Sequence, residues 1–258
     1  RDLYAIFGWP QQITIADYRE KYERGGLAKR LVECFPNATW RGGLELFEDE
    51  DPTIDTEFEL AWKALNGRLN IWSTLQRADI LAGLSTYSVI LIGAQGELST
   101  ELPKGSPDQL IYLTPYLGGG GPGFGNQRAR VVAMTADATI QSFDEDVHSH
   151  RFGEPLTYTL KRTNASTPAF DRPVHYSRIV HVAEGCLEDT VMGTPVLQNV
   201  FNLLLDLEKV TGGGSESFFQ RAKHSLHLNV DKTMTWNTDD KAALKERSRA
   251  EYKTEMDA

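Results

Sequence analysis

Two pairs of histidines have the residue type and spacing that could support metal binding. His148 and His150 alternate, so both rings would point to one face of a strand, while His224 and His227 would share one face of a helix. Imidazole is a common zinc ligand, but neither pair has a third ligand at an obvious spacing. We therefore expect surface or hydrogen-bonded histidines here, with no metal site and no cofactor.

Hydrolysis of a phosphodiester by histidines would need two His-x-Ser/Thr motifs, because one histidine acts as the general acid and the other as the general base. The sequence has one such motif, His175 followed by Tyr176 and Ser177. It has no Gly-x-Ser-x-Gly nucleophile elbow, and the glycine-rich residues 117–125 lack the Gly-Lys-Ser/Thr of a phosphate-binding loop. The residues therefore predict no catalytic centre and a protein that is not an enzyme.

Helical periodicity dominates the first third of the chain. Gly25 and Gly26 divide the first helical stretch into two short helices, and Thr56 and Glu59 form a capping box before the next one. Apolar residues recur at helical spacing over residues 15–35, 58–72 and 73–84.

Strand-like sequence follows these helices. The runs are residues 87–92, 110–117, 130–143, 156–162 and 175–182, and a polar loop with Pro168 and Pro173 precedes the last one. Helices first and mixed or antiparallel strands afterwards predict an α+β fold rather than a regular alternation.

Composition limits the classes of function. A chain of 258 residues that is 40% hydrophobic can bury a core, and it has no apolar run of ~18 residues that could span a membrane. The net charge of −9 argues against tight binding to DNA phosphates, although it does not argue against passage of DNA. Cys34 and Cys186 lie far apart, which predicts two buried thiols and no disulfide.

A long helix is expected over residues 195–222. Thr194 can cap its first amides, and Pro195 suits the first helical position because it lacks an N–H. A narrow apolar seam then recurs at spacings of three and four residues, formed by Leu197, Val200, Leu204 and Leu207. A seam of this width favours packing of one helix against another, along a rod of roughly 42 Å.

Gly212, Gly213 and Gly214 lie inside this helix, and each should destabilise it by about 1 kcal/mol relative to alanine. Two interpretations are open. In one, the helix ends at Thr211, a second helix begins near Ser215, and the glycines form a linker. In the other, the backbone of a neighbour approaches too closely for a side chain, which predicts a ring or bundle of like helices.

Two stretches around this helix carry a resemblance to a known family. The sequences SRIVHVAEG (residues 177–185) and LEDTVMGTPVLQNVFNLLLDLEKVTGGGSESFF (residues 187–219) resemble portal proteins of tailed bacteriophages. The similarity is to the portal family that is sometimes fused to an anti-defence phosphodiesterase. Residues 6–43, 71–96 and 151–160 match in the same order, and none of the matching pieces includes a catalytic signature.

The resemblance implies a domain organisation. Residues 1–190 would form the wing, an α+β domain of helices and mixed or antiparallel strands, and residues 191–222 the long stem helix. Residues 223–258 would begin the clip, with the chain ending within or before it. Leu197, Val200, Leu204, Leu207 and the three glycines would then make helix-packing or oligomer contacts, while Asp206, Glu208 and Glu216 are candidates to face the lumen.

The function implied is that of a portal subunit, assembled in the host cytoplasm and placed at one vertex of the virion capsid. About twelve copies would form a ring through which double-stranded DNA passes non-specifically during packaging and ejection. The expected partners are further copies of the chain, the major capsid protein, the terminase large subunit and a head–tail adaptor, with no membrane. Two alternatives are a phosphodiesterase acting on cyclic oligonucleotides and a head–tail adaptor or scaffold-binding protein that forms no ring.

Overall fold

The computed structural model describes residues 2–48, 56–105, 109–119, 136–162, 170–187 and 189–222, together with residues 239, 242–243 and 245–246. The chain divides into two compact units, Arg1–Leu205 and Asp206–Ala258. The sheet, the helices that cover it and the first residues of the last helix all belong to the first unit.

Six helices lie among the described residues, and local signals set their ends. They are α1 (Leu3–Phe7), α2 (Ile15–Arg24), α3 (Gly26–Thr39), α4 (Glu57–Leu69), α5 (Ile71–Leu84) and α7 (Phe201–Ala222). Thr14 and Asp17 form a capping box on α2, and the Thr56 hydroxyl accepts from the Glu59 amide at the start of α4. Asn70, with a φ of 49°, ends α4 in the left-handed conformation and precedes α5. None of these helices combines the length and hydropathy that a membrane span requires.

A six-stranded mixed sheet follows α5, with the strand order β5-β4-β3-β2-β1-β6. Its strands are β1 (Tyr87–Ala94), β2 (Leu110–Gly118), β3 (Ala138–Phe143), β4 (Pro155–Arg162), β5 (Phe170–His175) and β6 (Ile179–Val182). β2 and β3 run parallel, meeting at Gly118 and Ala138, and every other neighbouring pair is antiparallel. The α+β prediction is therefore confirmed.

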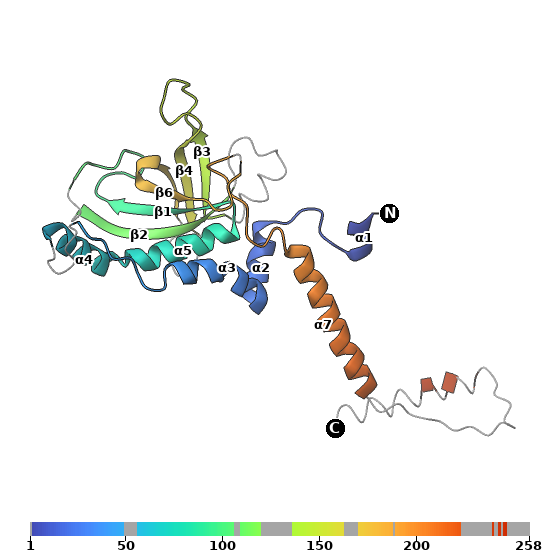
Figure 1. The fold of residues 1–258 in the computed structure, drawn as a ribbon. Coiled ribbons are helices and arrows are strands. Elements are labelled where there is room, and N and C mark those ends of the chain that lie inside the picture. Colours follow the sequence, from blue (N-terminus) through green and yellow to red (C-terminus); the bar gives the residue numbers. More distant parts are fainter. Residues whose placement is uncertain are drawn as a thin grey trace. The chain divides into compact units, whose positions relative to one another are not determined.

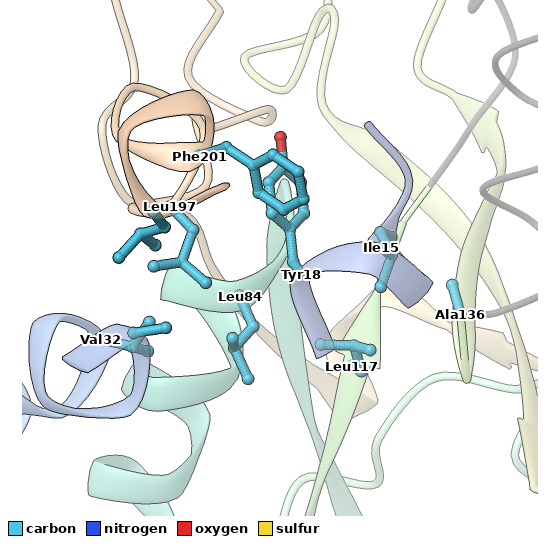
Figure 2. Close-up of a cluster of buried hydrophobic side chains, with 10 residues drawn as sticks. Ile15, Tyr18, Val32, Leu84, Leu117, Ala136, Leu197 and Phe201 are labelled. Carbon is cyan, nitrogen blue, oxygen red and sulfur yellow. The ribbon is translucent and has the colours of Figure 1, made fainter. Parts of the chain in front are cut away.

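Helices cover one face of this sheet, as Figure 1 shows: α5 lies against β1 and β2, and α2 and α3 pack on α5. Apolar side chains from these helices, β2 and the segment that leads into α7 form one core cluster (Figure 2). A second cluster lies within the sheet and includes Tyr87, Val89, Leu91, Tyr116, Ile140, Leu160 and Val174. The start of α7 is thus part of the domain core.

The strand predictions need two corrections. The polar loop predicted around Pro173 instead contains β5, an edge strand paired only with β4, where a residue lacking an N–H is tolerated. The single strand predicted over residues 175–182 is divided by a 3₁₀ turn, η2 (Tyr176–Arg178), so that only Ile179–Val182 pairs with β1. The short helix α1 was not predicted.

The long helix begins at Phe201, not at Pro195 as predicted. The amides of the predicted first turn are used elsewhere: Thr194 donates to the Glu184 carbonyl at 2.8 Å and Val196 to the Gly83 carbonyl at 2.9 Å. Residues 196–200 form turns instead, in which Gln198 donates to the Pro195 carbonyl at 3.0 Å. Tertiary hydrogen bonds therefore outweigh the local start signal.

The glycines do not interrupt the helix, because α7 continues through Gly212, Gly213 and Gly214 to Ala222. The linker interpretation is therefore wrong. The prediction of two buried thiols is also wrong, since Cys34 and Cys186 are both free and exposed. Cys34 lies on the side of α3 turned away from Ala28, Val32 and Pro36, which are the residues that α3 buries.

Candidate functional site

The first part of the predicted apolar seam packs inside the domain. Leu197 is fully buried and Leu204 is 7% exposed, and both lie in the cluster shown in Figure 2. Phe201 lies between them and meets the ring of Tyr18 edge-on, with 5.7 Å between centroids. Val200 is partly buried against the same cluster. These residues anchor the start of α7 to α2, α3 and α5.

Further along α7 an apolar stripe is exposed. Leu203, Leu207, Val210 and Phe218 share one face of the helix, because each residue advances about 100° around the axis. Their exposed fractions are 68%, 47%, 72% and 75%. Leu207 is thus the point at which the predicted seam leaves the core. Large apolar side chains that share one exposed face are a common mark of an interaction surface.

The three glycines of α7 have open space around them. A Cβ atom placed on Gly212, Gly213 or Gly214 would meet nothing within 4 Å. Among the described residues, therefore, no packing offsets their cost to the helix of about 1 kcal/mol each. Two side-chain hydroxyls bond the backbone beside them: Thr211 donates to the Leu207 carbonyl and Ser215 to the Thr211 carbonyl, both at 2.8 Å.

The three acidic residues named as lumen candidates do not share one face. Glu208 and Glu216 are exposed and lie about 80° apart around the axis, whereas Asp206 lies about 160° from Glu208. Asp206 is half-buried and forms a salt bridge with Lys209 at 3.3 Å. Glu216 accepts a hydrogen bond from Gln220.

Arg178 is a fully buried side chain that the sequence reasoning missed. Its guanidinium donates to four backbone carbonyls: to Thr100 at 2.9 Å, Gln95 at 3.0 Å, Glu101 at 3.3 Å and Ala94 at 3.4 Å. These contacts hold the loop after β1 against η2. Arg178 belongs to residues 177–185, one of the stretches that resemble portal proteins, and its contacts stabilise the fold of the domain.

His181, in the same motif, is built into the sheet. Its Nε2 lies 2.7 Å from the Val191 carbonyl, which can only accept, so Nε2 carries a proton. Nδ1 therefore accepts from the Tyr158 hydroxyl at 3.1 Å when the ring is neutral. The ring also stacks on Tyr87, with 4.8 Å between centroids. Burial raises the pKa values of both tyrosines, so their hydroxyls remain protonated and can donate.

Burial lowers the pKa of His181 below its ordinary value of 6.5, so the folded state disfavours the imidazolium. The stability that comes from a neutral His181 is present above about pH 6.5 and is lost as the pH falls through the lower folded-state pKa. We expect the difference in the free energy of unfolding between the wild type and His181→Gln to decrease from about pH 7 to about pH 5, because only the wild type loses this contribution. Urea denaturation at each pH measures this. An NMR titration that placed the His181 pKa at or above 6.5 would contradict it.

Of the other histidines singled out from the sequence, His148, His150 and His175 lie among the described residues. His148 and His150 are exposed in the turn between β3 and β4, not on a strand as supposed. His175 accepts from the Ser177 amide and hydrogen-bonds its hydroxyl at 2.9 Å, which caps η2. His224 and His227, like most of the glycine-rich loop, lie outside the described residues. Within the part of the chain that is described, no three His, Cys, Asp or Glu side chains gather as metal ligands.

Buried polar groups hold the domain together, and α7 is one of the elements that leave large apolar side chains exposed. A family model described as phage portal protein matches residues 16–256. The chain therefore belongs to the phage portal protein family, as the resemblance predicted. No match was found among curated proteins. Portal proteins are in general structural and not enzymatic, and membership implies an oligomeric assembly associated with the phage capsid.

Proposed function

We propose that the chain is one subunit of a closed ring at a capsid vertex, through which DNA is packaged and ejected. Residues 1–190 act as the wing, residues 191–222 as the stem that borders the central hole, and residues 223–258 as the start of the clip. Family membership supports the portal role in general. The observation that supports the ring is α7, which leaves Leu203, Leu207, Val210 and Phe218 exposed and has open space at its three glycines among the described residues.

The geometry of α7 supports contact between copies. Leu207, Val210, Gly214 and Phe218 lie on the same side of the helix, at spacings of three and four residues. A second copy that covers this side removes apolar surface from water and uses the missing side chain at Gly214 for close approach of two backbones. Packing between copies would then offset the loss of helix stability that the three glycines cause.

The remaining faces of α7 suit a passage for DNA. Glu208 and Glu216 are exposed on the side of α7 away from the apolar stripe and are our candidates to face the hole. Asp206, the third candidate, lies at the edge of that side of the helix. A wall of mixed or negative charge does not neutralise phosphates, so it lets the duplex slide without binding it tightly. The net charge of −9 per chain fits this role.

The proposed partners follow from the portal role: further copies of the chain, with about twelve in the ring, the major capsid protein, the terminase large subunit, a head–tail adaptor and passing double-stranded DNA. In this account the subunit hydrolyses nothing and acts by holding its partners around one axis.

Native mass spectrometry of the purified chain tests the ring directly. We expect one dominant species whose mass is a fixed multiple of the 28.9 kDa chain. A Leu207→Ser/Val210→Ser double variant should shift the population towards single chains, because each serine removes apolar contact area. A chain that stays monomeric at all concentrations would contradict the proposal and favour an adaptor that forms no ring.

A further inference from the structure

Two carboxyl groups meet between α5 and the segment that follows β6. The Glu184 Oε2 atom lies beside Gly83 of α5, one helical turn after Asp79, and the Asp79 carboxyl is close enough to share a hydrogen bond with it. Ionised carboxylates are acceptors only, so this bond requires a proton on one of them. Asp79 also accepts from the indole N–H of Trp40, at the end of α3, at 2.9 Å. The pair therefore joins three elements of the first unit and holds one proton.

The backbone around Glu184 fixes the approach to α7. Its carbonyl accepts from the Thr194 amide at 2.8 Å, so Glu184 closes a loop across residues 184–194. Beside it, the Gly193 amide donates to the Thr86 carbonyl at 2.7 Å and the Val196 amide to the Gly83 carbonyl at 2.9 Å. A Cβ atom on Gly83 would stand 3.6 Å from the Glu184 Oε2 atom and 3.3 Å from a methyl group of Val196. The carboxyl pair thus lies directly beside these backbone contacts.

Few other charged side chains among the described residues interact electrostatically with the carboxyls of Asp79 and Glu184. Asp79 is the charged side chain that affects Glu184, and neither residue forms a salt bridge within the described part of the chain. On the elements packed nearby, Arg77 of α5 is exposed, Glu33 of α3 bonds the Tyr22 hydroxyl, and His181 of β6 bonds a tyrosine and a carbonyl. Negative charge on the pair is therefore not balanced by a nearby cation.

We propose that Asp79 and Glu184 form a proton-dependent latch that holds residues 184–196, and with them the start of α7, against α5. With one shared proton the two side chains attract each other. When both are ionised, the hydrogen bond is lost and two like charges repel at contact distance. The three backbone bonds of Gly193, Thr194 and Val196 then open more often, which loosens the segment that leads into the helix.

The direction of the pH effect follows from the state of Glu184. Burial, with the hydrogen bond and charge of Asp79, raises the pKa of Glu184 from 4.5 to about 7. A carboxyl whose pKa is raised on folding stabilises the folded state fully below the unfolded value and loses that contribution as the pH rises through the folded value. The latch is therefore closed near pH 6 and opens towards pH 8.5. This is the opposite direction to the effect of His181, which acts on the acid side.

Hydrogen–deuterium exchange of the whole chain tests the latch, with the amides of Gly193, Thr194 and Val196 as reporters. After correction for intrinsic exchange, we expect their protection to fall roughly tenfold between about pH 6 and pH 8.5. Glu184→Gln keeps the shape and can still donate to Asp79, so its protection should change less than about twofold over the same range. Equal pH dependence in the wild type and in Glu184→Gln would overturn the proposal.

Three further measurements guard against indirect effects. Glu97→Gln makes the same chemical change at an exposed carboxyl and should leave the wild-type pH dependence intact. A carbon-13 NMR titration of Glu184 in the unmodified chain depends on no substitution, and a pKa near 4.5 would also overturn the latch. If Asp79→Asn, which likewise removes one ionisable group, restores protection at pH 8.5, the proposal is supported.

Discussion

Replacing Arg178 by methionine is expected to lower the free energy of unfolding by about 4 kcal/mol, because four backbone carbonyls that bond a fully buried guanidinium lose their donor at once. Methionine fills much of the same volume but donates nothing. The loop after β1 would have to open to water or bury unsatisfied acceptors. Urea denaturation followed by circular dichroism measures the change, and limited proteolysis should cut this loop first.

A matched control separates the buried network from the loss of a positive charge. Arg172 lies exposed on β5, so Arg172→Met removes the same charge without removing a buried donor, and we expect a change within about 0.5 kcal/mol. Arg178→Lys should remain strongly destabilised, because one ammonium group cannot reach four carbonyls in the geometry of a guanidinium. Near wild-type stability in Arg178→Met would show that these contacts contribute little.

The second large effect is expected at Gly214, where leucine should abolish ring closure while the first unit stays folded. The structure leaves open space around this position, so leucine is tolerated within a single chain and even improves helix propensity by about 1 kcal/mol. Against a neighbouring backbone the same side chain would separate the two helices. Size-exclusion chromatography with light scattering reports the assembly, and thermal unfolding reports the fold.

Position on the helix provides the control for this prediction. Gly212→Leu makes the same change about 160° away around the axis, where a smaller loss of assembly is expected. Gly214→Ala should fall between the wild type and Gly214→Leu, because its single methyl group adds less bulk. If Gly214→Leu assembles as the wild type does, the result would contradict the proposal that two helices approach closely at the glycines.

The sequence predicted the element types better than their ends. Apolar periodicity located α2 to α5, and β-branched runs located β1, β2 and β4, because these patterns arise from faces that are buried in the domain. β5 was not predicted because Pro173 is typical of a loop, although an edge strand tolerates proline. The start of α7 was misplaced because Thr194 and Pro195 form a correct local signal, but the amides of Thr194 and Val196 donate instead to the carbonyls of Glu184 and Gly83. Such bonds join residues far apart in sequence.

The buried polar residues were harder to predict for the same reason. Arg178 binds carbonyls that lie 77 to 84 positions earlier, and Glu184, in the segment after β6, meets Asp79 of α5. No spacing in the sequence reveals such pairs. The portal resemblance did mark the stretch that contains Arg178, His181 and Glu184, but the pattern alone did not say what these residues do. The apolar seam was read as one continuous surface, whereas Leu197 and Leu204 pack inside the domain and Leu207 is exposed.

Electron microscopy of the purified chain tests the central claim most directly. Class averages should show rotationally symmetric closed rings, and a map from them should place α7 of every copy beside the central hole, with Leu207 and Gly214 towards the next copy. Particles of a single chain, or rings in which α7 lies at the outer rim, would contradict the account.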